Sequence, residues 1–97
     1  MICSNLRIKD NVLFFGGRST VELAEKYGSP IYVMDERTIR ENCRKYTVAM
    51  KKYFGESAKP FYASKACCFK KIYNIVDSEG MCVDVVSPGE IYTAKSA

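Results

Sequence analysis

The feature that most constrains the fold is the order of apolar stretches in the second half of the chain. Residues 61–64 and 82–86 are short apolar runs typical of buried strands, and residues 67–78 between them have the periodicity of a helix. A further helix follows residue 86. Strand, helix, strand and helix at this spacing predict an α/β fold with a parallel sheet.

The first part of the chain has a different pattern. Residues 6–8 and 12–15 are strand-like and flank the polar segment 9–11, which predicts a β-hairpin. Residues 31–34 are a short apolar run and are predicted to form a strand.

Polar residues that can cap a helix precede three amphipathic segments. The predicted helices are residues 20–27 after Ser19, residues 36–54 after Asp35, and the helix after Ser87. Ser87 is followed by Pro88, which suits a first helical position, and by Glu90, which completes a capping box. In the helix 36–54 a predicted core-facing stripe recurs every three or four positions: Ile39, Cys43, Tyr46, Met50 and Tyr53/Phe54.

The chain is 97 residues long, and its sequence stops inside a predicted helix. Two parallel strands leave open sheet edges that a complete fold would close. We therefore expect a fragment or truncated product of a larger protein.

Charge and cysteine content argue against several classes of protein. The net charge of +4 comes from interleaved basic and acidic residues, which is typical of a solvated surface and not of a nucleic-acid interface. No apolar run approaches the length of a membrane span, and no secretory signal is present. Five cysteines without a CxxC pair or any histidine predict no metal site, and they fit free thiols in the cytoplasm.

Two residues near the predicted strand ends can carry chemistry. Lys65 follows the strand 61–64, at the sheet edge where catalytic residues gather in a (β/α)₈ barrel, and a lysine amine can attack an aldehyde. Asp84 interrupts the apolar run 82–86 and is expected to be buried and to pair with Lys65. The alternatives are a solvated lysine at a helix start and a solvent-facing carboxylate on an edge strand.

Three segments resemble motifs of the fold-type III pyridoxal-phosphate decarboxylases. Residues 61–66 (FYASKA) resemble the Y-A-x-K-A segment with the cofactor lysine, and residues 84–90 (DVVSPGE) resemble D-V-V-S-G-G-E. Residues 23–33 (LAEKYGSPIYV) resemble L-A-x-x-Y-G-T-P-L-Y-V, which is typical of the diaminopimelate decarboxylase branch. The segments occur in the family's order and cover about residues 13–97. Pro88 replaces the usual glycine.

The resemblance implies a fold and a site. Residues 18–97 would open a (β/α)₈ barrel, and the hairpin in residues 1–17 would join a separate β domain. Lys65 would hold pyridoxal 5'-phosphate covalently, and Asp84 would help to set the protonation of that lysine. Tyr62 and Ala63 would line the cofactor's side of the barrel.

The resemblance also implies an activity: decarboxylation of meso-diaminopimelate to L-lysine by a homodimer. The residues that stack on the cofactor, bind its phosphate and contact its ring nitrogen would lie beyond residue 97, so this piece alone would be inactive. Two alternatives remain open. One is a relative that acts on ornithine, arginine or a carboxylated polyamine, and the other is a non-catalytic remnant or interaction fragment.

Overall fold

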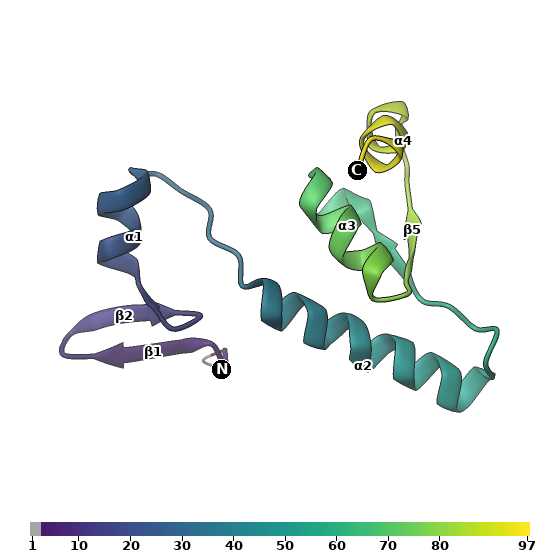
Figure 1. Cartoon of the computed structure of the whole chain (residues 1–97), viewed down its shortest axis with the longest axis horizontal. Helices are drawn as coiled ribbons and strands as arrows, with labels where there is room; N and C mark the ends of the chain where they lie inside the picture. The colour runs from purple at the N-terminus through teal and green to yellow at the C-terminus, as the bar shows by residue number, and fades with distance from the viewer. Residues whose placement is uncertain (1–2) are drawn as a thin grey trace. The chain divides into compact units, whose positions relative to one another are not determined.

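The computed structural model describes residues 3–97 and divides the chain into two compact units, residues 1–38 and residues 39–97 (Figure 1). Each unit contains one small sheet with helices. The chain is therefore an α/β protein, as predicted. None of the helices in the described part is both long and apolar enough to cross a membrane.

The first unit is built on the predicted hairpin. Strands β1 (Leu6–Lys9) and β2 (Val12–Phe15) pair antiparallel, and the short strand β3 (Arg18–Ser19) extends the sheet. Asp10 and Asn11 form the turn with positive φ angles of 50° and 60°. Short polar side chains tolerate this conformation, and the turn it makes matches the twist of paired strands.

Helix α1 (Thr20–Tyr27) begins and ends as predicted. The Ser19 hydroxyl accepts a hydrogen bond from the backbone N–H of Glu22 at 3.3 Å, which caps the helix. At the other end, Gly28 has a φ of 83°, a left-handed conformation that glycine adopts without strain.

The predicted strand at residues 31–34 is wrong. These residues form no ladder in the part of the chain that the structure describes, and Tyr32 is fully exposed. An extended segment becomes a strand only when a neighbour satisfies its backbone groups, and an apolar run cannot supply that neighbour by itself.

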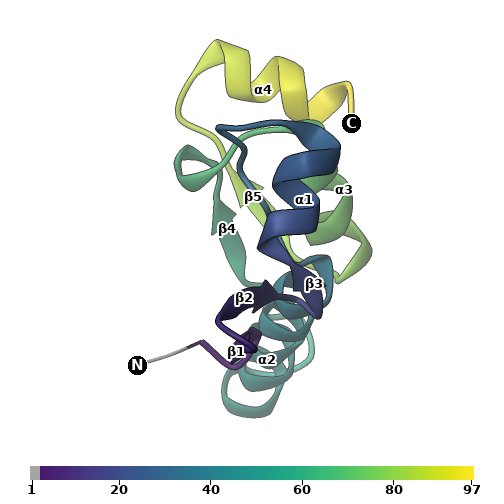
Figure 2. The same cartoon turned by 90° about the vertical axis from the view of Figure 1, so that its left-hand side faces the viewer.

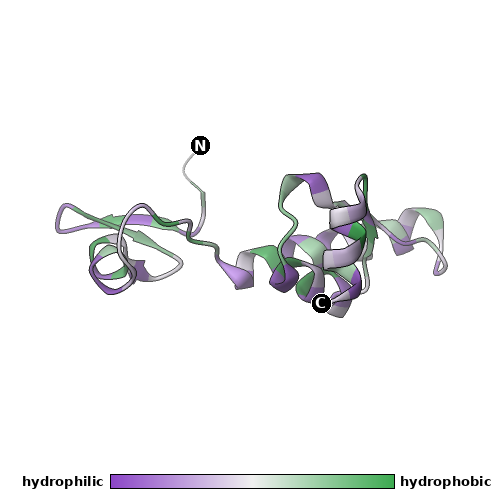
Figure 3. Cartoon of the chain, turned by 90° about the horizontal axis from the view of Figure 1, so that it is seen from above, coloured by the Kyte–Doolittle hydropathy of each residue, from purple (hydrophilic) through white to green (hydrophobic). Residues whose placement is uncertain are grey.

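Helix α2 (Glu36–Phe54) has the predicted bounds. The carboxylate of Asp35 accepts hydrogen bonds from the backbone N–H groups of Arg37 and Thr38, at 3.1 and 3.4 Å, and caps the helix. Hydrophobic and hydrophilic residues follow one another along α2 (Figure 3). The stripe is buried only in part: Cys43 is buried, whereas the side chains of Tyr46 and Tyr53 are exposed.

The second unit contains the predicted parallel pair. Strand β4 (Phe61–Ala63) pairs with β5 (Cys82–Asp84), and the two strands lie side by side (Figure 2). Helix α3 (Lys70–Ser78) connects them, and helix α4 (Pro88–Lys95) follows. The core cluster consists of Cys43 of α2 with Ile72 and Val76 of α3. This cluster packs against one face of the sheet.

Helix α3 begins three residues later than predicted. A one-turn 3-10 helix, η1 (Ser64–Ala66), comes first, and Cys67 then adopts an extended conformation. The hydroxyl of Tyr62 donates a hydrogen bond to the Cys67 carbonyl at 2.9 Å. The extended Cys67 therefore belongs to the segment that separates η1 from α3.

An ion-pair cluster joins α2 to the end of α3. The carboxylate of Glu79 accepts hydrogen bonds from Arg44 at 2.6 and 2.9 Å and from Arg40 at 2.9 Å. The Arg44 guanidinium, followed by that of Arg40, lowers the pKa of Glu79 below its usual value of 4.5. A carboxyl group with a lowered pKa in the folded state stabilises the protein when it is ionised.

We expect the stability of the chain to fall as the pH drops below 4.5 and Glu79 takes up a proton. In Glu79→Gln that part of the pH dependence should be absent, because the amide does not titrate. Urea denaturation at pH 3.5–7 measures the free energy of unfolding of the wild type and of the variant. Glu56→Gln is the control, since Glu56 is exposed and its carboxylate lies 3.6 Å from the amine of Lys51, which is itself exposed. Equal pH slopes for Glu79→Gln and wild type would contradict the expectation.

Candidate active site

The carboxyl ends of β4 and β5 bring the two predicted chemical residues to one edge of the parallel sheet. Lys65 lies in η1, two residues after β4 ends, and Asp84 is the last residue of β5. Asp84 pairs in register with Ala63. The carboxyl ends of parallel strands meet at the same edge, and sites in α/β proteins form there.

Both predicted residues are exposed. The expectation of a buried Asp84 is wrong, and Lys65 is solvated, as in the alternative given for it. Among the described residues, β4 is the only strand that pairs with β5, and the core cluster covers a single face of the pair. Asp84 can therefore remain hydrated, which removes the reason to expect a buried ion pair.

Tyr62 and Ala63 do not point to the same side of the sheet. Neighbouring residues in a strand alternate between its faces. Tyr62 packs against the core cluster, and burial raises the pKa of its phenol. Ala63 and its partner Asp84 belong to the opposite face. The two side chains therefore belong to different faces of the strand, and their contact with the cofactor stays a prediction.

Ser64 is the residue at this edge that the sequence did not single out. It is fully buried, and its hydroxyl contacts both the backbone carbonyl of Asp84, at 2.9 Å, and the carboxylate of Glu90. A hydroxyl carries one proton, so Ser64 shares it between these two acceptors. Ser64 therefore connects β4, β5 and the first turn of α4. The sequence signal that could have indicated Ser64 is a hydroxyl residue at the end of an apolar strand, directly before a lysine.

Glu90 makes contacts beyond the predicted capping box at the start of α4. Its backbone N–H donates to the Ser87 hydroxyl at 3.2 Å, and Pro88 occupies the first helical position, as predicted. Its carboxylate additionally accepts from the backbone N–H of Val86 at 2.9 Å. The Ser64 hydroxyl and then this amide lower the pKa of Glu90 below its usual range. Glu90 is thus held as an anion beside the residue that precedes Lys65.

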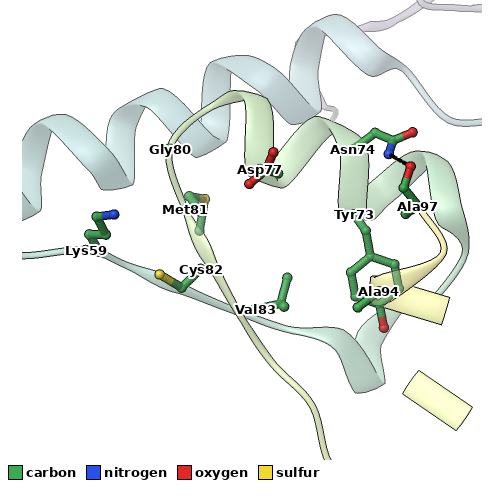
Figure 4. A pocket seen from close by; sticks show the side chains of 10 residues that line it. All are labelled: Lys59, Tyr73, Asn74, Asp77, Gly80, Met81, Cys82, Val83, Ala94 and Ala97. Carbon is green, nitrogen blue, oxygen red and sulfur yellow. Dashed lines mark hydrogen bonds between the residues drawn. The ribbon is translucent and has the colours of Figure 1, made fainter. Parts of the chain in front are cut away.

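A separate pocket of about 540 Å³ lies along α3, β5 and the end of α4 (Figure 4). The residues around it include Tyr73 and Ala94, and Asn74 donates a hydrogen bond to the Ala97 carbonyl at 2.7 Å. Neither Lys65 nor Asp84 lines this pocket. The Tyr73 hydroxyl is buried without a hydrogen-bond partner among the described residues.

No group of three or more potential metal ligands lies together in the part of the chain that the structure describes. The chemistry available at the sheet edge is that of one primary amine, one hydrated carboxylate and a buried Ser–Glu contact.

Comparison with known proteins identifies similar sequences and structures. Residues 36–97 match the family model described as pyridoxal-dependent decarboxylase, pyridoxal binding domain. The chain is 47% identical over 87 residues to a diaminopimelate decarboxylase of Methanothermobacter thermautotrophicus, and 42% identical over 93 residues to that of Methanocaldococcus jannaschii. These alignments cover 88% and 93% of the chain but only 20% and 21% of the relatives.

Solved structures give the same result. The crystal structure of the M. jannaschii diaminopimelate decarboxylase in complex with L-lysine superposes with a TM-score of 0.82 at 41% identity. That match covers 96% of this chain and 22% of the solved one. A protein from Aquifex aeolicus matches with a TM-score of 0.77 at 33% identity. The chain spans about a fifth of the length of the relatives it matches.

Proposed function

The chain belongs to the pyridoxal-dependent decarboxylase family, and on that premise we propose that it supplies the cofactor-anchoring edge of a diaminopimelate decarboxylase. The observation that carries the proposal is the position of Lys65. It is an exposed amine at the carboxyl edge of a parallel strand pair, inside the segment that the family model matches. The complete activity would be decarboxylation of meso-diaminopimelate to L-lysine.

The residues at this edge fit pyridoxal phosphate. Lys65 offers a primary amine to the aldehyde, and the small side chain of Ala63 leaves space beside the strand end. The carboxylate of Asp84 ends the neighbouring strand at the same edge and can attract a positive charge there. When bound, the cofactor supplies an electron sink for the carbon that loses the carboxylate.

Three residues at or near this edge then have defined tasks. Lys65 holds the cofactor by its amine nitrogen, and Asp84 sets where a proton lies at this edge. Tyr62 supports the site from behind the strand, because its hydroxyl fixes the Cys67 carbonyl after the lysine turn.

The proposed architecture follows the same family. Residues 18–97 would form the opening of a (β/α)₈ barrel with β4 and β5 as consecutive strands, and the hairpin in residues 1–17 would join a β domain. The parallel pair with a helical crossover supports this assignment. We further propose a homodimer located in the cytoplasm. The five cysteines are free, which suits a reducing compartment.

The substrate is proposed from the relatives. Eight of them are 35–47% identical to this chain, and all eight are named diaminopimelate decarboxylase. Ornithine, arginine and a carboxylated polyamine remain the competing substrates, and a non-catalytic fragment is the competing role.

The test is a chimera in which this chain replaces the matching fifth of the M. jannaschii enzyme. We expect it to release carbon dioxide from meso-diaminopimelate and to form L-lysine. The parent M. jannaschii enzyme is the positive control, and circular dichroism establishes that the chimera is folded. Faster carbon dioxide release from ornithine, arginine or a carboxylated polyamine would reassign the substrate. A folded chimera that is inactive on all four would favour the non-catalytic role.

A further inference from the structure

We propose that the contact between Ser64 and Glu90 is a positioning device that fixes the backbone around Lys65 relative to Asp84. The proposal rests on the proposed function, in which Lys65 anchors the cofactor. It assigns a task to two residues that otherwise only cap a helix and end a strand.

The contact joins the backbones of both candidate residues. Ser64 directly precedes Lys65, and its hydroxyl reaches the carbonyl oxygen of Asp84 at 2.9 Å. The same hydroxyl reaches the carboxylate of Glu90. Ser64 is fully buried, so water does not reach its hydroxyl to replace these two partners. The hydroxyl oxygen of Ser64 thereby links three parts of this unit: the lysine turn, the end of β5 and α4.

Glu90 is itself held firmly. Its carboxylate accepts from the Val86 backbone N–H at 2.9 Å. Hydrogen bonds to an ionised acceptor are shorter and about twice as strong as neutral ones. The anion therefore acts as an anchor that α4 provides for the preceding strand ends.

The lysine turn needs such an anchor. Lys65 lies in a single 3-10 turn, whose hydrogen bonds have poorer geometry than those of an α-helix. The lysine side chain is exposed, so packing does not fix its direction. Errors of about 1 Å in the placement of a reacting group can cost roughly 100-fold in rate.

The test compares two serines that differ in which contact they make. Ser64→Ala removes the contact to Glu90, whereas Ser87→Ala removes the α4 cap and leaves that contact in place. Each variant is made in the chimera described above, incubated with limiting pyridoxal 5'-phosphate and reduced with borohydride, and the modified lysines of this chain are mapped by mass spectrometry. The chain has ten lysines, so labelling without preference would give Lys65 one tenth of the label.

We expect Lys65 to take most of the label in the wild type and in Ser87→Ala. In Ser64→Ala its share should fall several-fold toward one tenth. Glu90→Gln should give the same loss by an independent change, and the double variant should lose no more than either single one, because both residues act through one contact. Circular dichroism shows whether each variant keeps its helices, and Glu90→Gln decides the question if Ser64→Ala does not fold.

Two outcomes overturn the inference and leave the proposed function standing. One is an undiminished preference for Lys65 in Ser64→Ala and Glu90→Gln. The other is an equal loss in Ser87→Ala, which would mean that any loosening of α4 has this effect. A wild-type chimera without preference for Lys65 is a different result, because it would overturn the proposed function and the inference together.

Discussion

Replacing Lys65 with arginine is expected to reduce turnover of the chimeric enzyme by roughly 1000-fold or more, the scale on which enzymes respond to loss of a covalent catalyst. The guanidinium keeps the positive charge but does not deprotonate in proteins, so it cannot act as the nucleophile. Borohydride should then fix no cofactor at position 65. Because Lys65 is exposed, the substitution should change stability by less than about 0.5 kcal/mol.

Lys70→Arg is the matched control for this substitution. Lys70 is exposed, lies in the same unit and begins α3 five residues later. It should retain full turnover and full labelling of Lys65. Recovery of the reduced cofactor on a lysine other than Lys65 in the unsubstituted chimera would show that the anchor has been assigned to the wrong residue.

The substitution Ile72→Ala is expected to remove about 2–5 kcal/mol from the free energy of unfolding. Ile72 is 4% exposed and belongs to the cluster that packs α3 against α2 and the sheet. A chain of this size buries a modest core, so a loss on this scale is a large part of its stability. Urea denaturation followed by circular dichroism should show a much lower midpoint or no cooperative transition.

Val48→Ala provides the comparison, because Val48 lies on α2 and is 65% exposed. It should lower the midpoint only slightly. Similar losses for the two variants would mean that the cluster around Ile72 does not hold this unit together.

Local signals in the sequence predicted the starts of α1, α2 and α4 and the hairpin correctly. The caps at Ser19, Asp35 and Ser87 depend on residues within three positions of one another, and each cap is present. The pairing of β4 with β5 was also predicted, since a strand–helix–strand order favours a parallel neighbour. The helix caps and the hairpin turn could be predicted because the residues that form them are close in the sequence.

The errors arose where the outcome depends on distant partners. Residues 31–34 are apolar enough for a strand, but a strand forms only where a second one is available. The burial of Asp84 was inferred from its apolar neighbours, whereas its exposure depends on what covers that face of β5.

The candidate site was predicted in its chemical residues but not in its supporting contacts. Lys65 and Asp84 lie at one edge as expected, and the motif residues alone were sufficient to select them. The contact between Ser64 and Glu90 spans 26 positions, and the contacts of Glu79 with Arg44 span 35. Sequence spacing does not reveal pairs of this kind, because they depend on how the strands and helices pack.

The sharing of one carboxylate between a helix cap and a strand end limits how this protein can be engineered. Stabilisation programmes often redesign the first turn of a helix, where better caps are easy to find. In α4 such a change would also alter Glu90, the partner of Ser64. A variant with higher thermal stability would then have lower activity. The first turn of α1 is the safer target for a designer, because its cap is made by Ser19 and Glu22, which belong to the other unit of the chain.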